Sequence, residues 1–149
     1  MTIIQITGVS GSAPNYRLEL SDHGHSVVRG KVKIQWQVIP NTKVVCIEDI
    51  FWKDVSGSTD IFDPPDPEPL NPQKTVWQGK NKSGIACTYI YGIKWVHADD
   101  GKTYDFDPII SIRPALDPGR FSLMGGLLGV VGVVALGAAI LLIRNRRTK

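Results

Sequence analysis

KVKIQWQVI, residues 31–39, alternates apolar with polar side chains and is the clearest periodic stretch in the chain. One side would carry Val32, Ile34, Trp36 and Val38, and the other Lys33, Gln35 and Gln37. Successive side chains of a strand point to opposite faces of a sheet. The stretch therefore predicts a β-strand with one buried and one solvated face.

The next stretch continues the same period. Residues 43–53 follow Pro40 and Asn41, which favour a tight turn. Two strand-like runs separated by a short turn are typical of a β-hairpin. Residues 31–39 and 43–53 are therefore predicted to pair as antiparallel neighbours.

A second hairpin is predicted further along the chain. Its apolar face alternates along two strands: Ile85, Cys87, Tyr89, Tyr91, Ile93 and Trp95 on the first, and Tyr104, Phe106, Ile110 and Ile112 on the return. Asp99, Asp100 and Gly101 supply the turn between them. This hairpin should contribute a large share of the core.

Shorter alternations predict further strands over residues 2–7, 16–20 and 75–78, and no helical period occurs before Leu123. About six to eight strands in this length indicate two packed antiparallel sheets. In strand count and alternation the domain resembles immunoglobulin-like and cupredoxin-like sandwiches. That resemblance implies an all-β, antiparallel β-sandwich and carries no function with it.

Residues 60–72 form a proline-rich acidic segment. Prolines stand at positions 64, 65, 67, 69 and 72, and acidic residues at 60, 63, 66 and 68. Proline has no amide hydrogen to donate to a sheet, so the segment is predicted to run outside the sheets as a stiff loop. It would serve either as a crossover between the sheets or as a protruding arm for a partner.

Leu123 to Ile143 contains 21 residues and no charge. At ~1.5 Å per residue a helix of this length measures about 31 Å, enough to cross the hydrocarbon of a bilayer. Four basic residues follow it: Arg144, Arg146, Arg147 and Lys149. The chain is therefore divided into a β-sandwich domain (1–116), a short linker (117–122), one C-terminal transmembrane helix (123–143) and a basic tail (144–149).

The predicted membrane helix has small residues on one face: Gly125, Gly129, Gly132 and Ala139. Small residues let a second helix approach closely, which favours a membrane partner, either a copy of this chain or a larger membrane complex. The alternative is that these positions reflect only the high frequency of glycine in membrane helices.

Two rules disagree on the side of the membrane that the β-domain occupies. The Met1 end has no charged and apolar leader, which indicates a tail-anchored protein with its domain in the cytosol. The basic tail, by the positive-inside rule, favours export of the domain instead. We expect a single-pass membrane protein and favour the cytosolic side.

The two cysteines and three histidines allow further interpretations. Cys46 and Cys87 lie in strand-like runs, and they would form either a disulfide between the sheets or free core thiols. His23 and His25 lack a third metal ligand nearby, and His97 is placed at the hairpin turn, so surface histidines are expected. The triplet at 81–83 matches a glycosylation acceptor.

Charge and motifs limit the function. Residues 1–143 hold 13 Lys and Arg against 14 Asp and Glu, so the domain lacks the basic excess of a nucleic-acid-binding domain. No phosphate loop, dinucleotide fingerprint or serine nucleophile elbow occurs, and no cofactor is expected. The first hypothesis is a membrane-anchored, non-catalytic structural or accessory subunit of a membrane protein complex. The second is a tethered recognition or adhesion module for a protein or carbohydrate, and the third is a metal-dependent enzyme that uses His23 and His25.

Overall fold

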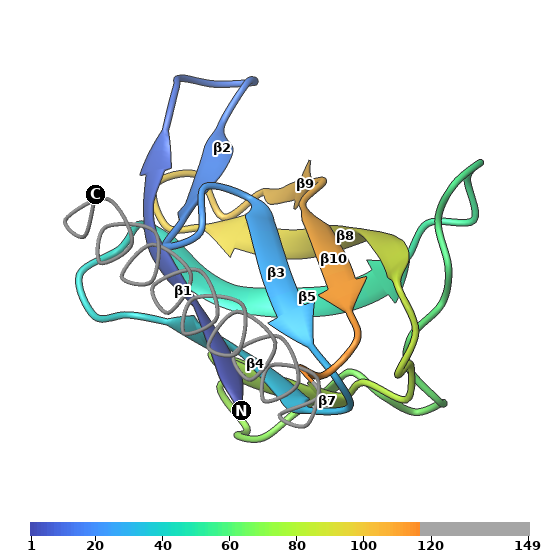
Figure 1. The fold of residues 1–149 in the computed structure, drawn as a ribbon. Coiled ribbons are helices and arrows are strands. Elements are labelled where there is room, and N and C mark those ends of the chain that lie inside the picture. The colour runs from blue at the N-terminus through green and yellow to red at the C-terminus, as the bar shows by residue number, and fades with distance from the viewer. Residues whose placement is uncertain (117–149) are drawn as a thin grey trace, which may run out of the picture. The chain divides into compact units, whose positions relative to one another are not determined.

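The computed structural model describes residues 1–116, which fold into two β-sheets that share one core (Figure 1). The first sheet has the strand order β2-β1-β4-β7-β6, and the second has the order β3-β10-β8-β5, with β9 also paired to β8. No helix occurs within these residues. The prediction of an all-β sandwich is therefore confirmed at this level.

The strands of the first sheet are β1 (Thr2–Ser10), β2 (Arg17–Leu20), β4 (Lys33–Val38), β6 (Glu68–Pro69) and β7 (Val76–Lys80). Those of the second are β3 (His25–Arg29), β5 (Val44–Trp52), β8 (Cys87–His97), β9 (Thr103–Phe106) and β10 (Ile109–Arg113). The strands that the sequence predicts over residues 2–7, 16–20 and 75–78 correspond to β1, β2 and β7.

Both sheets are mixed, so the prediction of purely antiparallel sheets is wrong. β1 runs parallel to β4, and β3 runs parallel to β10. A parallel pair needs a crossover connection rather than a tight turn. No local turn signal marks such a pair, and alternation reports which face of a strand is buried but not which strand lies beside it.

The first predicted hairpin is also wrong. β4 pairs with β1 on one edge and with β7 on the other, and β5 pairs with β8 in the second sheet. Because both edges of β4 are occupied, β5 has no place beside it. The turn around Asn41, whose φ is 66°, instead carries the chain from one sheet to the other.

The second predicted hairpin is confirmed. β9 pairs with the end of β8 and β10 with its beginning, in one continuous antiparallel register in which Ile93 faces Phe106 and Ile90 faces Ile109. The amide of Tyr91 donates to the Pro108 oxygen, at 3.3 Å, across the interruption between β9 and β10. β9 and β10 therefore act as one return strand along β8. The apolar face begins at Cys87, since Ile85 precedes the strand and is 74% exposed.

Residues 60–72 act as the predicted crossover, from β5 in the second sheet to β6 in the first. They do not run wholly outside the sheets. Glu68 and Pro69 form a two-residue edge strand on β7, where an absent amide hydrogen is tolerated. Ile61 and Phe62 are fully buried and anchor the loop in the core.

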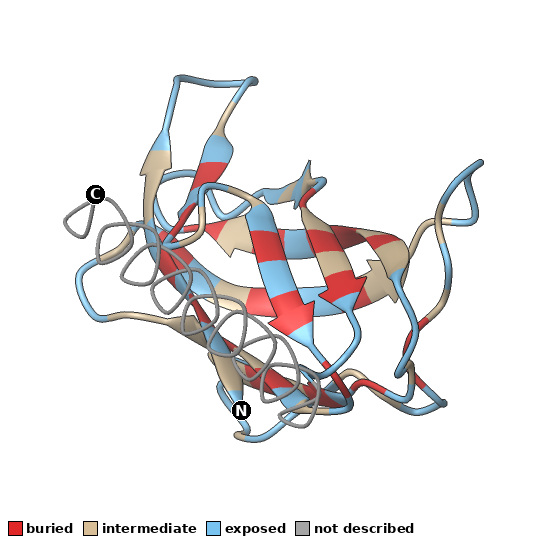
Figure 2. Ribbon diagram, in the orientation of Figure 1, coloured by how far each residue is buried: buried red, intermediate tan, exposed pale blue. Residues whose placement is uncertain are grey.

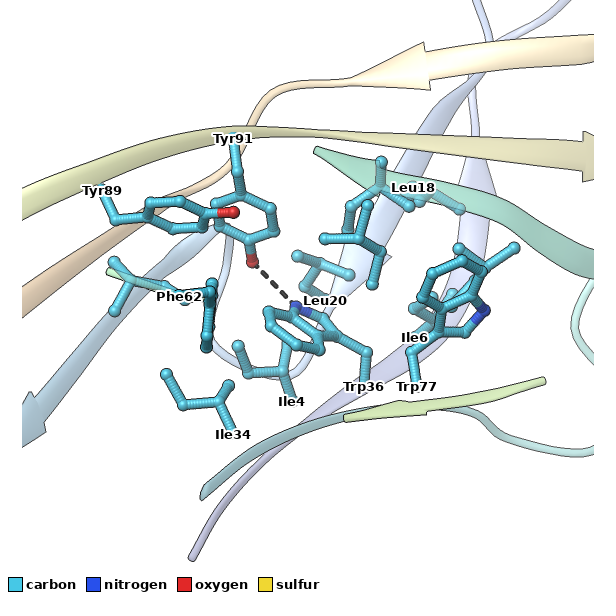
Figure 3. Close-up of a cluster of buried hydrophobic side chains, with 14 of the residues drawn as sticks. Ile4, Ile6, Leu18, Leu20, Ile34, Trp36, Phe62, Trp77, Tyr89 and Tyr91 are labelled. Carbon is cyan, nitrogen blue, oxygen red and sulfur yellow. Dashed lines mark hydrogen bonds between the residues drawn. The ribbon is translucent and has the colours of Figure 1, made fainter. Parts of the chain in front are cut away.

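The core fills the space between the sheets with aromatic and branched side chains (Figures 2 and 3). Trp36 of β4 meets Tyr91 of β8 and Phe62 of the crossover, with ring centroids 5.7 and 6.0 Å apart. Tyr89 stacks on Tyr91 at 5.1 Å. The alternation that the sequence assigns to β4 and β8 is therefore correct, because Ile34, Trp36, Tyr89 and Tyr91 are all buried.

Candidate functional site

A group of polar and aromatic side chains gathers at the end where β8 turns into β9, and we call this group the hairpin cluster. It consists of Tyr16, Lys43, Trp95, His97, Asp99, Asp100 and Tyr104. The turn matches the sequence prediction: the Gly101 amide donates to the His97 oxygen at 3.0 Å, and Gly101 has a φ of 63°. Positive φ suits glycine, and this position therefore fixes the turn.

His97 lies inside the hairpin cluster and exposes none of its side chain. Its ring stacks on Tyr16 at a centroid distance of 4.0 Å and meets the edge of Trp95 at 5.8 Å. Neither ring nitrogen has a hydrogen-bond partner among residues 1–116, although Nδ1 lies 3.4 Å from Asp100 Oδ1. The expectation of a surface histidine is wrong here, because His97 continues the buried phase of Tyr89, Tyr91 and Trp95.

Two carboxylates close the hairpin cluster on its solvent side. The hydroxyl of Tyr104 donates to Asp100 Oδ2 at 2.7 Å, which lowers the pKa of Asp100 and raises the pKa of Tyr104 to about 12. Lys43 pairs with Asp99, and this bond raises the pKa of the lysine. These groups satisfy one another and present hydrogen-bonding edges to solvent.

Two hollows flank β9. The larger, of about 480 Å³, lies between residues 14–17 and residues 103–107, so that Tyr16 and Tyr104 of the hairpin cluster form part of its wall. The other, of about 420 Å³, is lined by Leu18, Leu20, His23 and Phe106 together with Thr7 and Glu19. Phe106 borders both hollows. The two hollows lie near the residues where β3 and β10 begin. They are therefore away from Arg29 and Arg113, at which these two strands end.

The other two histidines, His23 and His25, have different surroundings. His25 bonds to Ser111 Oγ at 2.8 Å, and His23 is exposed with a φ of 55°. No group of three or more His, Cys, Asp or Glu side chains suited to a metal ion occurs within residues 1–116.

Cys46 and Cys87 are free in the described part of the chain and lie in the same sheet. Cys46 pairs with Val96, nine residues along β8 from Cys87. At about 3.3 Å per residue this separation approaches 30 Å, against the roughly 4–7 Å that a disulfide requires between Cα atoms. A bridge between the sheets is therefore contradicted, and burial raises the pKa of the Cys46 thiol.

The glycosylation triplet is not available in the folded domain. Asn81 is fully buried, and its Nδ2 donates to the Gly30 oxygen at 2.9 Å. The Asn81 amide donates to the Val32 oxygen at 3.1 Å. Asn81 therefore joins the end of β3 to the first sheet rather than offering an acceptor to solvent.

The remaining predicted site residues lie outside the described residues. These are the helix-packing positions Gly125, Gly129, Gly132 and Ala139, and the tail residues Arg144, Arg146, Arg147 and Lys149. Sequence reasoning did not predict the hairpin cluster or the hollows. The signal available in the sequence was that His97 lies on the same face of the predicted strand as Trp95. Tyr16 is brought beside His97 only by the tertiary fold.

Within residues 1–116, no helix has the length and apolar character needed to cross a bilayer. No protein-family model matches the chain, and a search of curated proteins gives no match.

Proposed function

We propose that the chain is a single-pass membrane protein whose β-domain acts as a non-catalytic accessory subunit of a membrane protein complex. In this proposal an immunoglobulin-like or cupredoxin-like sandwich precedes one transmembrane helix over residues 123–143. The observation that carries the proposal is the position of the hairpin cluster and its hollows, at the end of the domain away from Arg113, where β10 leads toward the uncharged segment. A tethered domain would offer this end to a partner.

The chemistry of the hairpin cluster supports binding rather than turnover. Asp100 is held by Tyr104 and Asp99 by Lys43, while Tyr16 covers His97. A catalytic pair needs a nucleophile or base that reaches the substrate. The hairpin cluster instead presents exposed polar side chains beside the half-buried rings of Tyr16 and Tyr104, a composition suited to protein contacts.

The uncharged segment supports the membrane part of the proposal. Its glycine-containing face would pack against a partner helix, from a larger complex or from a second copy of this chain. We favour a cytosolic position for the β-domain, with export as the alternative that the basic tail favours.

Three measurements on the full chain test this proposal. Extraction of membranes with alkaline carbonate should leave the chain in the pellet, whereas a chain ending at residue 122 should be released. Mild-detergent native electrophoresis should place the chain in an assembly larger than itself, and Gly125→Leu with Gly129→Leu should dissociate it. Protease protection in sealed vesicles, with a tag at each end, reports the side of the domain. Release of the full chain by carbonate, or migration as a monomer, would contradict the proposal.

A second candidate function is a tethered recognition module for a protein or carbohydrate ligand. The hollow beside Tyr16 and Tyr104 favours it, since about 480 Å³ is large enough for one sugar or one peptide side chain. Trp77 is buried, and none of the exposed large hydrophobic residues of 1–116 is aromatic. The wall of the hollow is therefore the place to test for ligand binding. Replacement of Tyr104 by alanine should abolish ligand binding while leaving the carbonate result unchanged.

A further inference from the structure

Half of the basic residues in the described domain gather at one end of it. We call this group the basic end and define it as Arg29, Lys31, Lys33, Lys80, Lys82 and Arg113, six of the twelve Lys and Arg in residues 1–116. The same range holds 13 acidic residues, so the domain as a whole carries a charge of −1. Half of the positive charge of a near-neutral domain is therefore concentrated at one end.

Strand pairing brings these residues together from distant parts of the sequence. Arg29 at the end of β3 pairs with Arg113 at the end of β10, and Lys33 at the start of β4 pairs with Lys80 at the end of β7. The arrowheads of β3 and β10 point toward the same end of the domain as the N-terminus (Figure 1). Asn81 joins the two sheets there through its bonds to Gly30 and Val32.

The two cross-strand pairs place like charges opposite each other, which costs stability in a sheet. All six residues are exposed. Asp63 and Asp66 lie at the same end and line a hollow of about 240 Å³ with Lys31, Lys80, Asn81 and Lys82. Asp63 pairs with Lys82 at 2.8 Å, and the Lys80 amide donates to Asp66. The acidic side chains therefore neutralise only part of the basic end.

Exposed apolar side chains lie beside the basic end. Met1 and Ile85 are the most exposed large hydrophobic residues of 1–116, at 71% and 74%. Met1 precedes Thr2, which pairs with Ile34 next to Lys33. Ile85 lies two residues before Cys87, whose partner is Ile112. Basic side chains with neighbouring apolar ones are typical of surfaces that lie on lipid head groups.

The chain itself leads from the basic end toward the uncharged segment. Nine residues separate Arg113 from Leu123, and even fully extended they span only about 32 Å. If residues 123–143 cross a bilayer, this short connection holds the basic end at a high effective concentration beside the lipid surface.

We propose that the basic end docks on a bilayer surface that contains anionic lipids, and so orients the hairpin cluster away from the membrane. This inference rests on the proposed membrane anchor. Each basic residue near such a surface contributes about a fivefold factor to the docking equilibrium, and the attraction falls within a Debye length. Replacing three of them should weaken docking on the order of 100-fold.

The test uses the full chain in nanodiscs of phosphatidylcholine alone, or with about 30% phosphatidylserine, at low ionic strength. Lysines are acylated with a limiting reagent, and the rate at each lysine is read by mass spectrometry. Phosphatidylserine should slow Lys31, Lys33, Lys80 and Lys82 severalfold and leave Lys74, Lys94 and Lys102 unchanged as internal controls. Salt at about 0.5 M should remove the difference.

Two matched triple variants extend the test, with Lys82 as the reporter. Lys31→Gln, Lys33→Gln and Lys80→Gln together should abolish the protection of Lys82. Lys74→Gln, Lys94→Gln and Lys102→Gln together should leave it intact. A chain that does not copurify with the discs would contradict the anchor. If the chain is retained in the discs, three outcomes would contradict the docking alone. The acylation rates could be equal in both lipids, all lysines could be slowed uniformly, or only an added oligonucleotide could protect the lysines.

Discussion

The indole nitrogen of Trp36 donates a hydrogen bond of 3.0 Å to the hydroxyl of Tyr91, and this bond joins the two sheets across the core (Figure 3). Both side chains are fully buried, and burial raises the pKa of Tyr91. A buried polar pair is stabilising while complete, but the loss of one member leaves the other without a partner.

Tyr91→Phe should therefore lower the free energy of unfolding by about 1–3 kcal/mol, because the indole N–H of Trp36 loses its acceptor. Tyr89→Phe is the matched control, since Tyr89 stacks on Tyr91 but makes no hydrogen bond to the other core residues of Figure 3. All four tryptophans lie in the described domain, so tryptophan fluorescence of the full chain in detergent follows its unfolding. Equal losses in the two variants would contradict a role for the bond.

The phase of β4 gives a second prediction. Trp36→Ala removes a fully buried indole from the core and should cost ~3 kcal/mol or more, whereas Lys33→Ala on the solvated face should be within about 0.5 kcal/mol of the parent protein. The same thermal or denaturant unfolding measures both. A large loss for Lys33→Ala would mean that the strand buries the opposite face.

Gly79 gives a third prediction, because the ring of Phe62 lies where its side chain would be. A Cβ at this position would meet Phe62 at 2.7 Å, and both residues are buried. Gly79→Ala should therefore displace the crossover loop and cost about 1–3 kcal/mol. Gly84→Ala is the control, since its nearest neighbour would be the flexible end of Lys31 at 3.5 Å. A Gly79→Ala protein as stable as Gly84→Ala would show that Phe62 moves freely.

His97 gives a fourth prediction. Its ring nitrogens are buried without hydrogen-bond partners in the described domain, so an apolar ring of similar shape should suit the space better. His97→Phe should raise the free energy of unfolding by about 1 kcal/mol at neutral pH and keep the stacking on Tyr16. His23→Phe, at an exposed position, should change little. A destabilised His97→Phe would indicate that the contact with Asp100 outweighs the missing bonds.

The bond between Tyr104 and Asp100 predicts a dependence on pH. The pKa of Tyr104 is raised to about 12, so its contribution to the stability of the fold is complete below pH 10 and is lost as the pH rises toward 12. The pKa of Asp100 is lowered, so its carboxylate contributes to the stability of the fold at pH values above the ordinary pKa of an aspartate. This contribution is lost as the pH falls through the lowered pKa. Asp100→Asn should return the Tyr104 titration, followed by phenolate absorbance, toward pH 10. An unchanged titration would exclude the bond as the cause.

Local features of the fold could be predicted from the sequence. Alternation identified the buried faces of β4 and β8, and the turn at Gly101 followed from its residue types. These features depend on neighbours a few positions apart, where side-chain direction and backbone preference act directly. The return of β9 and β10 along β8 belongs to the same group.

Pairing between distant strands could not be predicted in this way. β4 alternates whether its neighbour is β5 or β1, so the parallel pairs were missed and a false hairpin was inferred. The hairpin cluster was missed for a similar reason, because Tyr16 reaches His97 across 81 positions. The basic end has a partial signal in the alternating Arg29, Lys31 and Lys33, but only the sheet brings Lys80 and Arg113 beside them.

The pairing of β3 with β10 also has a consequence for synthesis. Among residues 1–116, β3 pairs only with β10, and their first paired residues, His25 and Ile109, lie 84 positions apart. During translation β3 must wait, with neither edge paired, until β10 emerges from the ribosome, and such long-range closure is slow. At about 5–20 residues per second, the 30 residues from Arg113 to Ile143 follow within roughly 2–6 s. Closure of the second sheet and the appearance of the uncharged segment therefore compete in time, and variants that delay β10 should expose β3 to chaperones at that moment.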